Sequence, residues 1–270
     1  MAGQSPMKLF DARALRRHRA RAAKHPDPPD FLVLEAAETL ADRLDDVKRR
    51  FPFALDLGCR DGAMARVLKG RGGIECLVSA DPAPEFAKLA PLPALACEAE
   101  ALPFAPQSFD LVLSNLVLHW TNDLPGALIQ LRLALRPGGL LLASLFGGET
   151  LTELGQTLME AELEMEGGAG PRVSPFADLR DLGGLLQRAG FKEPVVDGDR
   201  IEVTYPDLPA LMRDLRAMGE SNALIERRRG LTRRATLARA GEIYRARFPA
   251  PGGRIRAGFQ VISLTAWAPG

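Results

Sequence analysis

The chain has 270 residues, of which 46% are hydrophobic and 26% charged, and its formal net charge is +1. A chain of this length can bury a substantial core, so we expect one large domain or one domain with appendages. The balanced charge argues against a dedicated nucleic-acid binder or a binder of anionic membranes. The sequence has no apolar stretch of about 18 residues, so we expect no membrane span.

Cysteines and the N-terminal composition bear on the compartment. Cys59, Cys76 and Cys97 are odd in number and widely spaced, which favours buried free thiols in a reducing compartment. Their spacing suits no zinc site, and we expect no metal. The first 25 residues are rich in Arg and Ala but lack the apolar core of a secretory signal. Their composition fits either a mitochondrial presequence or a basic surface helix.

Two helices are predicted before the first strand. Residues 10–24 form a basic helical pattern that ends before the prolines from Pro26 onward. This helix is either a solvated face or a lid over the site, at which Phe10 or an arginine touches substrate. Residues 31–50 place apolar side chains at helical spacing and should face a sheet. We assign residues 1–50 to a helical N-terminal extension.

Strands and helices alternate from residue 51 to residue 147. We expect strands at 53–57, 74–80, 94–97, 109–114 and 140–145, and helices at 63–69, 85–89 and 124–135. Such alternation predicts an α/β fold whose strands are parallel and joined by right-handed crossovers.

The pattern changes after residue 148. We expect helices at 150–166, 176–189 and 207–218, a basic helix at 227–239, two short strands around Asp197 and Gly198, and a last strand at 259–267. The basic helix is either a solvated face or a docking surface for an acidic partner. Residues 148–270 are interpreted as a substrate-side elaboration that completes the same sheet.

Polar groups at successive strand ends suit a single ligand. The first turn has an acid, Asp56, two residues before Gly58, where a diphosphate would be repelled but an ammonium group would be held. Asp81 ends the second strand and is placed to accept hydrogen bonds from two ribose hydroxyls. The turn N–H groups suit a carboxylate, and the region from Glu98 suits an adenine amino group. Together these groups favour S-adenosylmethionine over NAD as the cofactor. The predicted cofactor-binding residues are Asp56, Gly58, Cys59, Gly62, Asp81, Pro82, Glu98, Ala99 and Asn115.

Candidates for the acceptor side follow the fourth strand. His119 is either a base or substrate contact, or a hydrogen-bonded structural histidine. Trp120 either stacks on a substrate or the sulfonium, or packs in the core. Asn115 either contacts the cofactor or holds the turn. We name His119 and Trp120 as the predicted catalytic residues.

Several of these segments resemble class I S-adenosylmethionine-dependent methyltransferases. The resemblance rests on Asp81 and on the segments 55–59, 98–104, 109–114 and 135–139. It implies a Rossmann-like, seven-stranded, mostly parallel sheet with an antiparallel last strand. Two positions depart from the family pattern. Arg60 stands where a second glycine is usual, and Glu98 stands where an Asp is common.

A narrower resemblance covers nearly the whole chain. The segments 118–128, 145–154, 172–176, 212–224 and 253–256 are similar to the mitochondrial complex I assembly factor 5 family and its bacterial relatives. That family is related to the malonyl-carrier-protein O-methyltransferases of biotin synthesis, and its mitochondrial member is reported to hydroxylate an arginine of a complex I subunit.

The two resemblances leave three functions open. The first is methyl transfer to a small-molecule or protein acceptor, which is the main prediction. The second is a cofactor-binding assembly factor that hydroxylates or chaperones a respiratory complex subunit. The third is binding without catalysis. We expect a cytoplasmic protein, or a mitochondrial matrix protein if the chain is eukaryotic.

Overall fold

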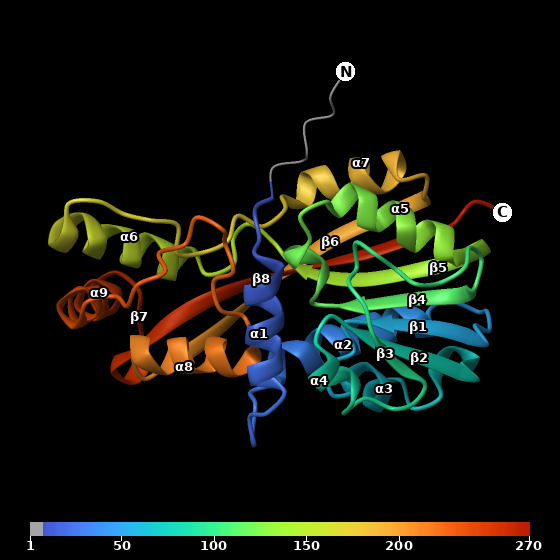
Figure 1. Cartoon of the computed structure of the whole chain (residues 1–270), viewed down its shortest axis with the longest axis horizontal. Coiled ribbons are helices and arrows are strands. Elements are labelled where there is room, and N and C mark those ends of the chain that lie inside the picture. The colour runs from blue at the N-terminus through green and yellow to red at the C-terminus, as the bar shows by residue number, and fades with distance from the viewer. Residues whose placement is uncertain (1–7) are drawn as a thin grey trace.

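The computed structural model describes residues 8–270, so the part of the predicted N-terminal extension at residues 1–7 lies outside it. A single sheet runs through the molecule in the order β3-β2-β1-β4-β5-β8-β6, with β7 paired to β8 (Figure 1). Its strands are β1 (Phe53–Leu57), β2 (Cys76–Asp81), β3 (Ala94–Ala96), β4 (Phe109–Asn115), β5 (Leu135–Phe146), β6 (Lys192–Tyr205), β7 (Pro249–Ala250) and β8 (Arg254–Trp267).

Strands β1 to β5 pair in parallel, whereas β8 pairs antiparallel to both β5 and β6. The helices are α1 (Ala12–Ala22), α2 (Phe31–Asp45), α3 (Ala63–Leu68), α4 (Pro84–Ala87), α5 (Leu124–Ala134), α6 (Thr152–Glu166), α7 (Leu179–Arg188), α8 (Leu208–Met218) and α9 (Arg234–Arg247). The predicted α/β fold with a mostly parallel sheet and an antiparallel last strand is confirmed. The sheet has eight strands instead of the predicted seven, because the two-residue strand β7 also pairs with β8.

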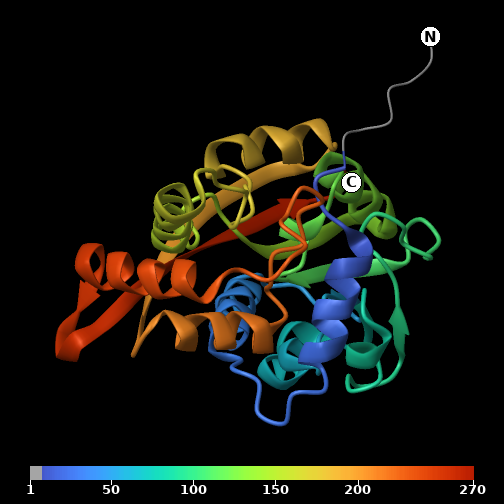
Figure 2. The same ribbon diagram turned by 60° about the vertical axis from the view of Figure 1, so that its left-hand side comes forward.

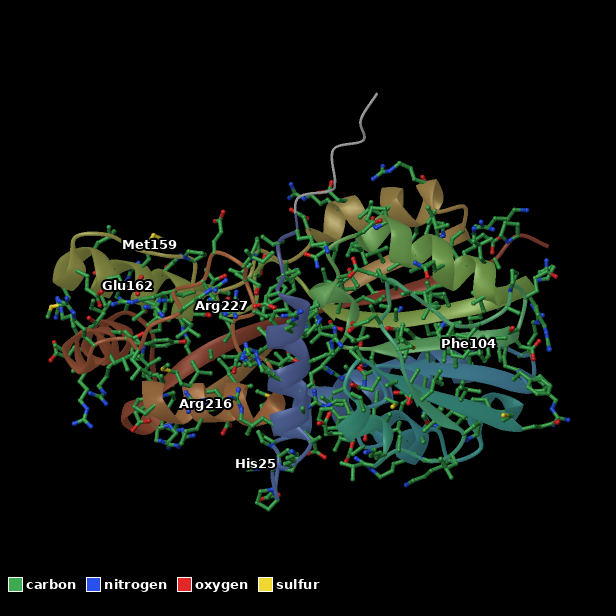
Figure 3. All side chains as sticks on the ribbon, viewed as in Figure 1. His25, Phe104, Met159, Glu162, Arg216 and Arg227 are labelled. Carbon is green, nitrogen blue, oxygen red and sulfur yellow. The ribbon has the colours of Figure 1, made fainter. Side chains whose placement is uncertain are left out.

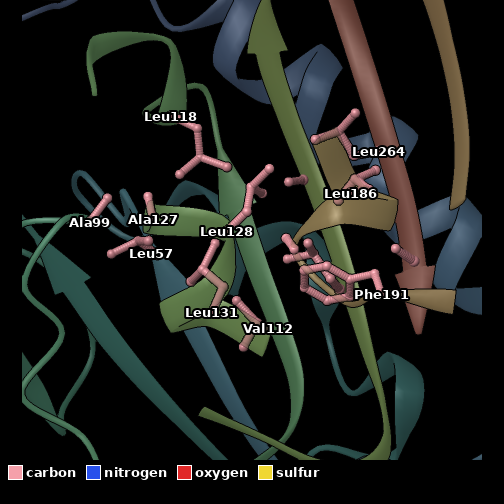
Figure 4. Close-up of a cluster of buried hydrophobic side chains, with 14 of the residues drawn as sticks. Leu57, Ala99, Val112, Leu118, Ala127, Leu128, Leu131, Leu186, Phe191 and Leu264 are labelled. Carbon is pink, nitrogen blue, oxygen red and sulfur yellow. The ribbon is translucent and has the colours of Figure 1, made fainter. Parts of the chain in front are cut away.

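Alternate residues of the buried strands pack against helices on opposite faces of the sheet. Val112 of β4 packs with Leu128 and Leu131 of α5 and with Leu186 of α7 on one face (Figure 4). Leu111 and Leu113 of β4 pack with α2 and α3 on the other face. Successive side chains point to opposite faces of a strand, so an apolar run with helices on both sides is fully buried.

The sheet extends beyond the parallel core through β6 and β8. Helices α6, α8 and α9 cover this extension, where Leu211, Tyr244 and Phe259 are buried together. In Figures 1 and 2 the extension carries these three helices to one side of the molecule. Helix α1 packs against both α8 and α4, so it lies between the extension and the parallel core.

The two short strands predicted around Asp197 and Gly198 are one continuous strand, β6. Gly198 pairs with Ile262 of β8 in the middle of this strand. A Cβ at Gly198 would lie 2.8 Å from Cδ1 of Leu179 in α7. The glycine therefore makes room for a helix that crosses the sheet and does not form a turn.

Two further predictions need correction. The basic helix expected at 227–239 begins only at Arg234, and Arg227 lies in the preceding loop, where its guanidinium donates to Asp11 and to the carbonyl of Leu224. All three cysteines are free thiols, but only Cys59 is buried, and Cys76 and Cys97 are half-buried. Within residues 8–270, no helix has both the length and the apolar composition needed to cross a membrane.

Candidate active site

Asp56 lies near the carboxyl end of β1 with a buried, unpartnered carboxylate. Its residue exposure is 0%, and neither oxygen accepts a hydrogen bond from any residue between 8 and 270. Burial, with a smaller contribution from the charge of Asp81, raises the pKa of Asp56 to about 8. Since buried acceptors are almost always paired, this carboxylate fits a group that brings its own donors, such as an ammonium.

Asp81 ends the neighbouring strand β2 and is also fully buried. Arg19 of α1 donates to both of its oxygens, from Nε at 3.1 Å to Oδ1 and from Nη2 at 2.5 Å to Oδ2. The backbone N–H groups of Arg60 and Ala83 donate to the same carboxylate at 3.1 and 2.8 Å. Asp81 thus lies at the carboxyl end of β2, as predicted, with an arginine of the N-terminal helix bound to it.

The turn after β1 is built differently from the prediction. The N–H groups of Gly58 and Cys59 both donate to the carbonyl of Ala80, and that of Gly62 donates to the carbonyl of Cys59. In this structure these N–H groups therefore bind backbone carbonyls and are not free for a cofactor carboxylate. Gly58 has a φ of +85°, and a Cβ there would lie 2.8 Å from Cβ of Val117. The glycine thus admits the loop after β4 rather than a ligand.

Arg60 occupies this turn in a left-handed conformation, with a φ of +50°. Its guanidinium is buried, donates to the carbonyl of Met218 at 2.7 Å and lies 4.8 Å from the ring centroid of Phe86. Burial and the nearby charge of Arg19 lower the pKa of Arg60 to about 10. The departure from the family glycine therefore brings in a side chain that links the turn to the end of α8.

The remaining predicted cofactor residues border the same strand ends. Pro82 follows Asp81 and is buried, as is Ala99. Glu98 is partly exposed and forms an ion pair with Arg16 of α1 at 3.2 Å. The amide of Asn115 donates to the carbonyl of Val33 at 2.9 Å, and its oxygen accepts from the hydroxyl of Ser144 at 2.8 Å. Asn115 therefore ties α2 to β5 in this structure.

His119 and Trp120 converge on a carboxylate that the sequence analysis did not single out. His119 Nε2 lies 3.2 Å from Oε2 of Glu220, and the Trp120 indole N–H donates to the same oxygen at 2.9 Å. The N–H of Phe146 points to His119 Nδ1 at 3.4 Å, which assigns the ring hydrogen to Nε2. Both ring nitrogens of His119 are thus engaged, and its side chain is 0% exposed.

Glu220 is charged despite its burial. Desolvation raises the pKa of this carboxyl, but the hydrogen bond from His119 and the positive charges of Arg60 and Arg19 outweigh it, so the pKa lies below its usual range. The Arg60 guanidinium lies 3.9 Å from Oε1 of Glu220. A buried polar chain therefore leads from Asp81 through Arg60 to Glu220 and Trp120.

A cavity of about 210 Å³ begins where this chain ends. Trp120 and Glu220 form part of its wall, and apolar side chains form most of the remainder, among them Phe146, Leu151, Leu154, Leu158, Phe176, Leu215 and Phe259. Arg172 and Arg216 also line it, and Arg172 is paired with Glu162. Figure 3 labels Glu162 on α6 and Arg216 on α8, which cover the extended part of the sheet.

Sequence reasoning missed Arg19 and Glu220. Arg19 belonged to the helix for which a lid was one alternative, and its guanidinium binds Asp81. Glu220 lay in the segment 212–224 that carried the narrower resemblance, and a lone acid in a loop gives no further signal. Partners so distant in sequence become visible only once the chain is folded.

Comparison with known proteins identifies the family. A family profile described as a methyltransferase domain matches residues 55–143. The mitochondrial arginine-hydroxylase NDUFAF5 of Homo sapiens is 41% identical over 268 residues, which cover 97% of this chain and 77% of that protein. The chain belongs to the methyltransferase-fold family of this protein. The prediction of this family is confirmed.

The same family includes malonyl-[acyl-carrier protein] O-methyltransferases. That of Xylella fastidiosa is 38% identical over 270 residues, which cover 97% of this chain and 89% of that enzyme. Among solved structures, the YcgJ protein of Bacillus subtilis matches with a TM-score of 0.55 at 14% identity, over 86% of this chain and 98% of that one. At this identity the match supports the fold alone, and it agrees with the Rossmann-like prediction.

Proposed function

We propose that this protein is an S-adenosylmethionine-dependent methyltransferase that binds its cofactor at the ends of β1 and β2. The observation that carries the proposal is the unpartnered, fully buried carboxylate of Asp56 beside Asp81. One acid suits the ammonium of the cofactor and the other its ribose. Its methyltransferase domain and its methyltransferase relatives support the same chemistry.

Methyl transfer requires little acid–base chemistry from the residues of this chain. S-adenosylmethionine supplies a methyl group that its sulfonium already activates, so alignment and exclusion of water matter most. Trp120 and Glu220 stand between the cofactor site and the cavity, and apolar side chains form most of the cavity wall, which suits the exclusion of water. We propose that the acceptor enters through this cavity, whether it is a small molecule or part of a protein.

His119 is better suited to positioning than to proton transfer in the conformation seen here. Its Nε2–H is directed at Glu220 and its Nδ1 accepts from a backbone N–H. We propose that it holds the Glu220 carboxylate at the cavity wall, while Trp120 contacts the acceptor. A His119→Gln variant should then bind the acceptor more weakly, seen as a higher KM. The pH dependence of its turnover should stay that of the wild type.

A second candidate function is action on an arginine side chain, as the name of the human relative states for that protein. The observation that favours it is Glu220, a charged carboxylate next to the rings of Trp120 and Phe176. A carboxylate with aromatic neighbours suits a guanidinium. In this reading the protein binds the cofactor and hydroxylates or chaperones a respiratory complex subunit, in the mitochondrial matrix if the chain is eukaryotic and in the cytoplasm otherwise.

Mass spectrometry of the product separates the two functions. Purified protein is incubated with S-adenosylmethionine and either a malonyl-loaded carrier protein or arginine-containing peptides. Methyl transfer adds one CH₂ unit to the acceptor and yields S-adenosylhomocysteine. Hydroxylation adds one oxygen atom and consumes dioxygen and a two-electron reductant, so both are included in the reaction. The proposal predicts the first result and its loss in the Asp81→Ala variant. Addition of oxygen without S-adenosylhomocysteine formation would favour the second function.

A further inference from the structure

We propose that Arg19 is an internal ligand of Asp81 that the cofactor ribose has to displace, so that α1 is a closed lid in this structure. This inference rests on the proposed function, since it takes Asp81 as the ribose-binding residue.

The carboxylate of Asp81 is saturated with donors. Oδ1 accepts from Arg19 Nε at 3.1 Å and from the N–H of Ala83 at 2.8 Å. Oδ2 accepts from Arg19 Nη2 at 2.5 Å and from the N–H of Arg60 at 3.1 Å. A carboxylate offers about four lone-pair sites, so two ribose hydroxyls find none free.

Arg19 is the donor that can leave. The N–H groups of Ala83 and Arg60 belong to the loops that follow β2 and β1, and they stay beside Asp81 as long as these strands pair. Arg19 reaches the site from a separate helix, 62 positions away in sequence. Ribose binding therefore exchanges two guanidinium hydrogen bonds for two hydroxyl hydrogen bonds.

Arg19 cannot stay in place after that exchange. It is 0% exposed, and its Nη1 has no hydrogen-bond partner among the residues that the structure describes. Its guanidinium lies 5.4 Å from the ring centroid of Phe86, which also faces the guanidinium of Arg60. A buried cation that loses its counter-ion pays a large desolvation cost, so the side chain and the helix that carries it have to move.

Movement of α1 would reach the acceptor cavity through the segment after α8. His18 Nδ1 contacts the carbonyl of Ser221 at 3.1 Å, and the N–H of Asp11 donates to the carbonyl of Ala223 at 2.8 Å. Ser221 and Glu220 both line the cavity. Cofactor binding is therefore coupled to the shape of the cavity, so that cofactor and acceptor each change the affinity for the other.

The affinity for S-adenosylhomocysteine in the Arg19→Gln variant tests the proposal. Removing the Arg19 guanidinium should tighten S-adenosylhomocysteine binding at least about tenfold, because α1 can then open without breaking the ion pair between Arg19 and Asp81. Arg21→Gln is the matched control, since Arg21 is an exposed arginine of the same helix with the same charge change. It should bind as the wild type does.

A kinetic measurement on the wild type keeps the test valid if Arg19→Gln does not fold. When a lid has to open first, the observed binding rate levels off as the S-adenosylhomocysteine concentration rises. A plateau with S-adenosylhomocysteine in excess that disappears with protein in excess supports the proposal, because only opening before binding limits the rate in this way. The same dependence in both experiments overturns it.

The failure of the lid and the failure of the proposed function give different results. If the wild type binds, Asp81→Ala weakens binding and Arg19→Gln binds equally or more weakly, the lid is wrong and the cofactor site stands. If Arg19→Gln binds and the wild type does not, the lid is supported in its strongest form. If neither protein binds, the proposed function fails and the lid fails with it.

Discussion

At the scale of single residues, Asp56 is the group whose chemistry is furthest from that of a free side chain. Burial raises the pKa of Asp56 to about 8, with a smaller contribution from Asp81. The folded protein thus keeps a proton that an unfolded chain releases near pH 4. The neutral carboxyl group is compatible with burial at low pH. Its ionisation at higher pH lowers the free energy of unfolding.

The free energy of unfolding should therefore fall as the pH rises from about 4 to about 8. The slope from this one group is about 1.4 kcal/mol per pH unit, because the native state binds one more proton than the unfolded state. Urea denaturation at several pH values measures it. Asp56→Asn should abolish this part of the slope, and Asp46→Asn, at an exposed position, should keep it. Equal slopes in all three proteins would contradict the assignment.

Glu220 is the second residue with a large expected effect. Removing this carboxylate takes away the ion-pair partner of the buried Arg60 guanidinium. It also leaves the side-chain N–H groups of His119 and Trp120 without their acceptor. Glu220→Ala should therefore lower the free energy of unfolding by about 3–5 kcal/mol. Glu226→Ala, at an exposed position of the same loop, should change it by less than about 0.5 kcal/mol. Denaturant titration of both variants decides, and similar values for the two would refute this role of Glu220.

At the scale of elements, the entry to α3 depends on a glycine for two reasons that can be separated. Gly62 has a φ of +86°, and a Cβ there would lie 2.6 Å from Cδ of Pro91. Gly70 has nearly the same φ, +85°, with no atom within 4 Å of the corresponding position. The two glycines differ in packing while they share their backbone conformation.

Alanine at either glycine should cost about 1–2 kcal/mol of backbone strain. Gly62→Ala should cost about 1–3 kcal/mol more, because Pro91 has to shift. Thermal or chemical denaturation of the two variants gives the difference directly. If Gly70→Ala is as destabilising as Gly62→Ala, contact with Pro91 contributes nothing measurable.

Helices and strands were predictable wherever apolar residues followed a single helical or strand pattern. The parallel strands and the helices between them follow from apolar runs broken by Gly and Pro, and their positions agree with the structure to within a few residues at most ends. Strand β6 was split in the prediction because Asp197 and Gly198 carry the usual signal of a turn. Only the contact of Gly198 with Leu179 of α7 explains why a glycine lies there, and that contact is tertiary.

At the scale of the whole molecule, the sequence located the strand ends of the site but not what lies against them. Asp56 and Asp81 follow from local pattern, because each sits at the end of a predicted strand. Arg19 and Glu220 come from segments far away in the chain, and helical periodicity shows which face of α1 is buried without showing its partner. The cavity likewise forms between loops and helices of the extension, and no local pattern describes it.

The proposed cofactor site requires Asp56 to receive the ammonium of S-adenosylmethionine. If it does, the bound cation lowers the pKa of Asp56, and near pH 7 the protein releases its proton on binding. Affinity should then rise with pH up to about 8, the pKa of the free carboxyl, and level off above it.

Calorimetric titration with S-adenosylmethionine at pH 7, in two buffers of different ionisation enthalpy, counts these protons. We expect micromolar binding, about 8 kcal/mol, with release of close to one proton by the wild type and much weaker binding by Asp56→Asn. Binding by the wild type without proton release, or undiminished binding by Asp56→Asn, would contradict this role of Asp56.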